Sequence, residues 1–202
     1  MRDKKFFFQH AFSAQTRKNE EKEVCFSRKL RGFSLVELLI AVAIVAILAM
    51  IAIPNFMTAV HRAKQKSTMK DIVSICTAIA GYVTDNESTP AQDGTYDGST
   101  DFYKALSPFY IKVFPINDKW GNNFRVWTGE SANQYGISNP TRNDILVASF
   151  GRDNKKDSFF FRINDPEGGI FLLTRMSDFN NDLIMWNGSW IRRPGTPSRR
   201  GC

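Results

Sequence analysis

Residues 29–54 read KLRGFSLVELLIAVAIVAILAMIAIP, and this stretch decides how the rest of the chain is interpreted. A basic segment ends at Gly32, and the run from Phe33 to Ile53 holds 21 residues with a single charge, at Glu37. As a helix this run would extend about 30 Å, the thickness of the hydrocarbon core of a bilayer. A cleavable secretory signal would have a shorter apolar region followed by a small-x-small site, and no such site follows here. Residues 33–53 are therefore predicted to span a membrane.

The 32 residues before this run are polar and basic, with nine Lys or Arg and four Asp or Glu. Positive flanks stay on the cytoplasmic side of a membrane helix, so residues 1–32 are predicted to be a cytoplasmic leader, with the rest of the chain outside. The leader holds most of the formal net charge of +7, and the last eleven residues add four arginines. The body of the chain is nearly neutral, which argues against nucleic acid as a partner.

A second helical pattern follows Pro54. A single proline kinks a helix more often than it ends one when tertiary contacts help, so we expect one long helix over residues 33–84 with a kink at Pro54. In its second half, apolar residues recur at the spacing of one buried helical stripe. These residues are Ile72, Ile75, Cys76, Ile79 and Val83.

The remainder reads as a small sheet domain. Residues 86–101 are polar and rich in turn residues, which predicts a loop. Short β-like runs separated by Gly, Asn and Asp then predict an antiparallel sheet. The runs are FRVW from residue 124, ILVASF from 145, FFFRI from 159, IFLLT from 170 and LIMW from 183. The predicted fold class is α+β, with the long helix packed on a head within residues 54–190, and a basic, flexible tail over residues 191–202.

Three features coincide in residues 29–54: a basic stretch ending in Gly32, an aromatic Phe33, and a carboxylate at the fifth residue after the bond between them. Together with the apolar run and Pro54, they resemble the type III signal of type IV pilins and of type II secretion pseudopilins. The resemblance implies that a membrane-bound prepilin peptidase removes residues 1–32 by cutting after Gly32. It further implies that the new amine of Phe33 is methylated, and that subunits with a pilin-like fold polymerise through the N-terminal helix.

The same resemblance implies partners and a location. The partners would be identical or homologous pilin subunits, the prepilin peptidase, and the assembly platform with its ATPase. The precursor would cross the bacterial inner membrane once, with the head in the periplasm, before entering a periplasmic or cell-surface filament. A carboxylate in the membrane core costs about 2.5–3.5 kcal/mol on insertion scales, so Glu37 calls for a partner. The Phe33 amine of a neighbouring subunit would supply one, and the alternative is a Glu37 solvated at the membrane interface.

Residues 116–124, INDKWGNNF, are similar to the Asp-x-Trp-Gly-Asn segment of the major pseudopilin of type II secretion. In that family a calcium ion lies in the C-terminal loops, and hard oxygen ligands on turns suit Ca²⁺. Lys155 and Lys156 weaken the negative field of one of the two acidic clusters here, and carboxylates solvated on turns are the alternative. The candidate ligands are Asp153 with Asp157, and Asp178 with Asp182.

Few residues suit catalysis, and the chain is predicted not to be an enzyme. Without the leader, His61 is the only histidine, so a Ser-His-Asp or Cys-His site is not expected, and without a CxxC pair neither is a zinc site. The four tryptophans and the Phe159–Phe161 run belong to cores more often than to sugar-binding platforms. Cys76 and Cys202 could form a disulfide or be two unrelated thiols.

The predicted function is a structural subunit of a type II secretion pseudopilus. The alternative within this class is a pilin of a type IV pilus for adhesion, motility or DNA uptake. The rival from another class is a single-pass membrane protein with a periplasmic carbohydrate-binding or hydrolytic head.

Overall fold

The computed structural model describes residues 32–165 and 167–195. The described residues fall into two units, one that ends at Ile44 and one that begins at Val45. Residues 32–34 have no regular structure, and helix α1 runs without a break from Leu35 to Asn86 with Pro54 inside it. The predicted long helix is therefore confirmed to within two residues at each end. The predicted leader lies outside the described residues except for Gly32.

The head contains a six-stranded sheet in the order β1-β2-β3-β5-β6-β4. Its strands are β1 Asp93–Thr95, β2 Arg125–Thr128, β3 Ile145–Ser149, β4 Ile170–Phe171, β5 Leu183–Trp186 and β6 Ser189–Pro194. The short helices are α2 Asp101–Leu106 and the 3-10 helices η1 Gly129–Ala132 and η2 Met176–Asn180. All neighbouring strands are antiparallel except β4 and β6, which are parallel. The α+β fold class is confirmed.

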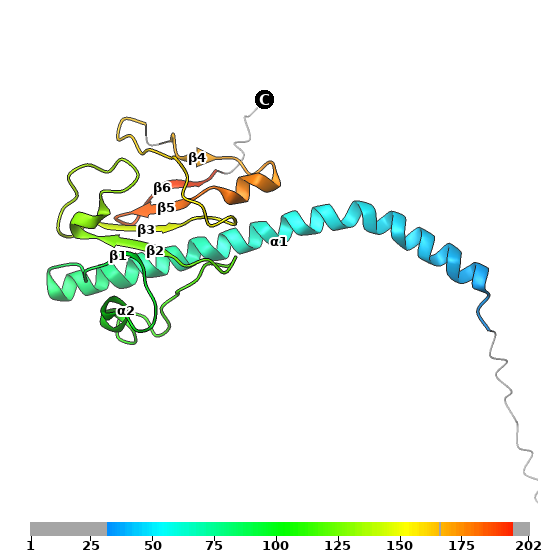
Figure 1. Cartoon of the computed structure of the whole chain (residues 1–202), viewed down its shortest axis with the longest axis horizontal. Helices are drawn as coiled ribbons and strands as arrows, with labels where there is room; N and C mark the ends of the chain where they lie inside the picture. The colour runs from blue at the N-terminus through cyan, green and yellow to red at the C-terminus, as the bar shows by residue number, and fades with distance from the viewer. Residues whose placement is uncertain (1–31, 166, 196–202) are drawn as a thin grey trace, which may run out of the picture. The chain divides into compact units, whose positions relative to one another are not determined.

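The central strands are buried on both faces because each face of the sheet has its own cover. Successive residues of a strand point to opposite faces. Val147 and Met185 pack with α1 in one hydrophobic cluster, while their neighbours Leu146 and Ile184 pack in a second cluster on the other face. Figure 1 shows the second half of α1 lying along the sheet. This two-sided burial explains why residues 145–148, Ile-Leu-Val-Ala, are continuously apolar instead of alternating.

The predicted helical stripe is confirmed in its position. Ile72, Ile75 and Ile79 are fully buried, Cys76 is buried, and Val83 is half-buried at the edge of the cluster. Burial raises the pKa of the Cys76 thiol to about 12, so this thiol is held neutral. Cys202, its possible disulfide partner, lies outside the described residues.

Three predictions about the head are wrong in detail. The run from Phe159 forms no strand, because its backbone makes a single bridging hydrogen bond, from Phe161 N to Tyr135 O at 2.7 Å, and its alternate rings pack on the second cluster. The loop predicted over residues 86–101 contains β1. The tail predicted from residue 191 begins instead with β6, which continues to Pro194, and residues 196–202 lie outside the described residues.

Candidate functional site

The predicted processing site is open to an enzyme. Gly32 and Phe33 precede the first turn of α1, and the Phe33 side chain is 75% exposed. The first helical bond runs from Leu38 N to Ser34 O at 3.1 Å, so the Gly32–Phe33 bond lies outside the helix. Exposed segments without regular structure are the usual sites of proteolysis, so the placement of this bond is consistent with the predicted cut.

The first part of α1 is left uncovered by the residues that the structure describes. Almost every residue from 33 to 53 is exposed, including large apolar side chains such as Leu39, Ile44 and Ile51. Among the described residues, α1 is the one helix long and apolar enough to cross a membrane. A contiguous apolar surface of this kind marks a segment that buries itself in a membrane or in other proteins.

Glu37 lies in the first turn of α1, where a carboxylate is favoured by the positive end of the helix dipole. It is exposed and is the acidic residue of an otherwise apolar surface. The geometry therefore leaves Glu37 available to a cation from another molecule. Its pairing with Phe33 of a neighbour stays a prediction.

Helix α1 continues through Pro54 without a break. Thr58 Oγ1 donates to Pro54 O at 3.1 Å, and Asn55 Nδ2 donates to Ile51 O at 3.4 Å. Proline has no N–H to donate to the carbonyl of Met50, and these two bonds, which reach other carbonyls, do not replace that one. A kink at Pro54 stays a prediction.

Two of the four predicted calcium ligands, Asp157 and Asp182, come together in the head. Asp157 N donates to Asp182 Oδ2, and Asp182 N donates to Asp157 Oδ2, each at 3.0 Å. Tyr135 Oη adds a hydrogen bond to Asp182 Oδ2 at 2.9 Å. Asp182 is fully buried, and burial, together with the nearby Asp157 charge, raises the pKa of its carboxyl to about 6.

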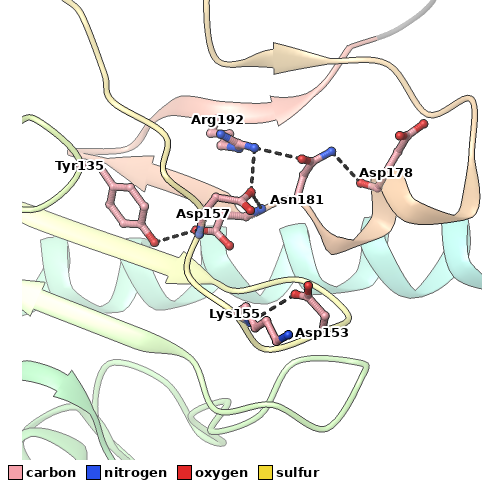
Figure 2. A network of polar contacts seen from close by, with 8 residues as sticks. Tyr135, Asp153, Lys155, Asp157, Asp178, Asn181 and Arg192 are labelled. Carbon is pink, nitrogen blue, oxygen red and sulfur yellow. Dashed lines mark hydrogen bonds and ion pairs between the residues drawn. The ribbon is translucent and has the colours of Figure 1, made fainter.

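Arg192, from β6, supplies the positive charge beside this pair. Its Nη2 lies 2.7 Å from Asp157 Oδ2 and 3.0 Å from Asn181 Oδ1. Figure 2 shows the guanidinium between these two side chains. Sequence reasoning had placed Arg192 in a flexible tail, so it missed this residue.

Asp153 and Asp178 have other partners. Asp153 Oδ1 accepts from Lys155 N within its own turn. Asp178 Oδ2 accepts from Thr174 N and Arg175 N and so caps η2, with its side chain directed away from Arg192 (Figure 2). In residues 32–165 and 167–195, no group of three or more His, Cys, Asp or Glu side chains could hold a metal ion. The four carboxylates as placed do not fit one calcium ion, and calcium binding itself stays a prediction.

The loops that carry these residues approach each other closely at Gly151. A Cβ at this position would come within 2.5 Å of Asn180 O, and the residue has φ +62°, which favours glycine. Arg152 N donates to Phe179 O at 2.9 Å and extends the contact. The segments 151–158 and 179–183 therefore form one paired unit at an end of the sheet, here called the C-terminal clasp.

The segment similar to the pseudopilin Asp-x-Trp-Gly-Asn motif is a structural joint. Asp118 is buried, and its Oδ1 accepts from Trp120 N and Asn122 N, each at 2.9 Å, while its Oδ2 accepts from Ser149 Oγ at 2.8 Å. Asn122 Nδ2 reaches Gly151 O at 2.8 Å. The motif thus connects β3 to the C-terminal clasp, which explains why these residue types occur together.

The same segment also holds α1. Lys119 N donates to the buried Thr68 Oγ1 at 3.1 Å, and Lys119 Nζ pairs with Asp71 at 2.8 Å. Trp120 Nε1 donates to His61 Nδ1 at 3.3 Å. Each bond joins the head to the second half of α1, so the motif fixes the helix on the sheet.

No catalytic arrangement accompanies these contacts among the residues that the structure describes. His61 accepts from Trp120 and lies 5.4 Å from the ring of Phe179, while burial and the charges of Arg152 and Lys64 lower its pKa. The Oδ2 atoms of Asp157 and Asp182 accept hydrogen bonds from each other's backbone N–H, which is a structural use of both carboxylates. The predicted core role of the aromatic residues holds in part: Trp127 is buried in the second cluster, Trp120, Trp186 and Trp190 are half-buried, and Phe160 is exposed.

Comparisons with known proteins match these features. The family described as the prokaryotic N-terminal methylation motif matches residues 27–53. Type II secretion system core protein G of Escherichia coli K12 is 32% identical over 106 residues, which cover 48% of this chain and 70% of that protein. The protein of the same name from Dickeya chrysanthemi is 30% identical over 140 residues, which cover 65% of this chain and 83% of that protein.

A pilus protein is also similar over a shorter length. Type IV major pilin protein PilA of Myxococcus xanthus is 40% identical over 62 residues, which cover 31% of this chain and 28% of that protein. No solved structure matches the chain. The names of these relatives denote secretion and pilus proteins, in keeping with a role other than catalysis.

Proposed function

Because this chain belongs to the family of type II secretion system core protein G, a family of pilin-like filament subunits, we propose that it is a structural subunit of a type II secretion pseudopilus. The observation that carries the proposal is the exposed apolar first part of α1, which begins at the methylation motif and bears Glu37 in its first turn. Soluble monomeric proteins rarely expose an apolar surface of this size, so it favours a subunit that contacts a membrane or other subunits.

The proposed sequence of events has three steps. The precursor is anchored in the inner membrane with its head in the periplasm, and a prepilin peptidase cuts between Gly32 and Phe33. The new Phe33 amine is methylated. The subunit then leaves the bilayer and packs with identical or homologous subunits through residues 33–53, driven by the assembly platform and its ATPase. The exposed Gly32–Phe33 bond and the uncovered apolar helix support the first and last steps.

A type IV pilus is the second candidate, supported by the similarity to the Myxococcus pilin. That similarity covers 31% of this chain, whereas relatives named core protein G match up to 65% of it. The longer matches favour the secretion pseudopilus. The buried Trp127 and the engaged carboxylates of the head count against a sugar-binding or hydrolytic protein.

Cleavage at Gly32 tests the proposal. Mass analysis of filaments sheared from producing cells should give a subunit that begins at Phe33 and carries one extra methyl group. Gly32→Leu should leave uncut precursor in the membrane and abolish filaments, because a bulky side chain blocks the peptidase. Gly98→Leu is the matched control, since Gly98 has no neighbouring atoms within 4 Å of an added Cβ. A different mature N-terminus, or normal cutting of the Gly32→Leu variant, would refute the proposed processing.

A further inference from the structure

The C-terminal clasp holds two carboxylates that face each other's backbone. Each of Asp157 and Asp182 accepts a hydrogen bond from the other's N–H, so their positions depend on each other. Two like charges at this separation, one of them fully buried, are stable only when a cation or a proton compensates them. The arrangement therefore calls for a positive charge.

Arg192 is held at this place by groups that suit a planar guanidinium. Its Cζ lies 4.8 Å from the centre of the Phe159 ring and 5.8 Å from that of Phe171. The guanidinium also contacts Asp157 and Asn181, and its strand, β6, pairs with β5, which directly follows Asp182. Aromatic faces attract a guanidinium, whereas a hard divalent ion is bound by six to eight oxygen atoms.

The Oδ2 atoms of the two clasp carboxylates already accept hydrogen bonds. Asp157 Oδ2 accepts from Arg192 and Asp182, and Asp182 Oδ2 accepts from Tyr135 and Asp157. Of the two Asp182 oxygens, only the buried Oδ1 has no hydrogen-bond partner among the described residues. The two Oδ2 atoms already accept two hydrogen bonds each, one of them from a fixed guanidinium, which suits the site poorly to an ion that needs six to eight oxygen ligands.

We propose that Arg192 is a built-in counter-cation that holds the C-terminal clasp closed without a bound calcium ion. This chain would then differ from the pseudopilin pattern, in which a calcium ion lies in the C-terminal loops. The inference concerns the stability of the head and does not depend on the proposed role in secretion.

Thermal unfolding of the full-length protein in detergent, followed by tryptophan fluorescence, tests the inference. The Tm of the wild-type protein should be the same in excess calcium and in excess chelator. Arg192→Gln should lower Tm by roughly 5–15 °C in chelator, because it leaves the half-buried Asp157 and the buried Asp182 without their cation. Calcium should then raise the Tm of this variant, since the free carboxylates can accept an ion.

Arg193→Gln is the matched control. Arg193 is the next residue of β6 and forms no ion pair with the described residues, so its loss should leave Tm nearly unchanged in both buffers. If the Arg192 variant does not fold, the double variant R192Q/D157N removes the uncompensated charge as well and should fold. A wild-type Tm that falls in chelator, an Arg192 variant as stable as the Arg193 control, or a double variant that is also unfolded would each overturn the proposal.

Discussion

Asp144 shows how a single buried carboxylate connects the start of β3 to the end of β5. Its Oδ1 accepts hydrogen bonds from Thr141 Oγ1 at 2.6 Å and from Asn187 Nδ2 at 3.1 Å, and its Oδ2 accepts one from Trp186 Nε1 at 3.3 Å. Burial alone raises the pKa of this carboxyl, but the hydrogen bonds together lower it more, so the pKa lies below its ordinary value. The ionised form is thus the one that stabilises the fold.

Asp144→Asn should therefore destabilise the head at pH 7 by about 1–3 kcal/mol. The substitution replaces charge-assisted hydrogen bonds with neutral ones, and the new NH₂ group of the side chain faces groups that are themselves donors. Because the pKa of Asp144 is lower in the folded than in the unfolded chain, its ionised carboxylate stabilises the fold at pH values above the pKa of the unfolded chain. This contribution is lost as the pH falls through the lower pKa of the folded state. The difference between variant and wild type should then shrink in strong acid. Urea unfolding at several pH values measures it.

The control for Asp144 is Asp93→Asn, which changes an exposed carboxylate of β1 and should shift the free energy of unfolding by less than about 0.5 kcal/mol. If the Asp144 variant and wild type differ in their free energy of unfolding by as much in strong acid as at pH 7, the prediction is contradicted. The loss of stability would then come from the shape of the side chain and not from its charge.

At the scale of elements, the helix was predictable and part of the sheet was not. The stripe through Ile72, Ile75 and Ile79 follows from its spacing alone, because a helix that covers a sheet must bury one face. Strand β6 was missed because its residues Arg192 and Arg193 read as solvent-exposed. Asn187-Gly188 between two β-like runs was the available signal: it forms the two-residue turn of the β5–β6 hairpin, with φ +46° and +79°.

The pairing of Asp157 with Asp182 could not be predicted, for a different reason. The spacing of carboxylates along the chain does not tell which loops contact each other. Here the segments 151–158 and 179–183 pair, which brings Asp157 into contact with Asp182, whereas Asp153 and Asp178 bond to other groups. The counter-charge came from a residue ten positions beyond Asp182, across a hairpin. Only the fold brings these groups together.

Helix α1 should lose its hold on the sheet when the stripe is shortened. Ile79→Ala removes a fully buried side chain from the cluster between α1 and the sheet and should lower the free energy of unfolding by about 2–5 kcal/mol. Val73→Ala, on the same helix but with a 43% exposed side chain, should cost less than about 1 kcal/mol. Chemical denaturation measures the free energy of unfolding of both variants. Equal decreases for the two variants would contradict the prediction, because they would mean that Ile79 contributes no more to packing than the half-exposed Val73.

At the scale of the whole molecule, the two parts of α1 have opposite surfaces. The second part buries its apolar stripe against the sheet, whereas residues 33–53 leave theirs uncovered. The described residues bury the core of the head but leave the first helix segment uncovered, which is typical of a segment that contacts lipid or other proteins. The carboxylate of Glu37 belongs to that uncovered segment, so we propose that a neighbouring subunit supplies its partner.

Replacing Glu37 by Leu should separate assembly from the steps before it. The variant should enter the membrane at least as readily as wild type, because a charge leaves the apolar run, and it should still be cut, because the Gly32–Phe33 bond is unchanged. Filaments should nevertheless be lost or become scarce, since each Phe33 amine would be buried without its counter-charge, a defect of about 3–5 kcal/mol for one partner of a buried pair. Glu130→Leu, which removes an exposed carboxylate of η1, is the control and should assemble normally. Membrane insertion, cleavage and sheared filaments are scored in the same cells. Normal filaments from the Glu37→Leu variant would show that Glu37 is solvated at the membrane interface and does not pair with the amine.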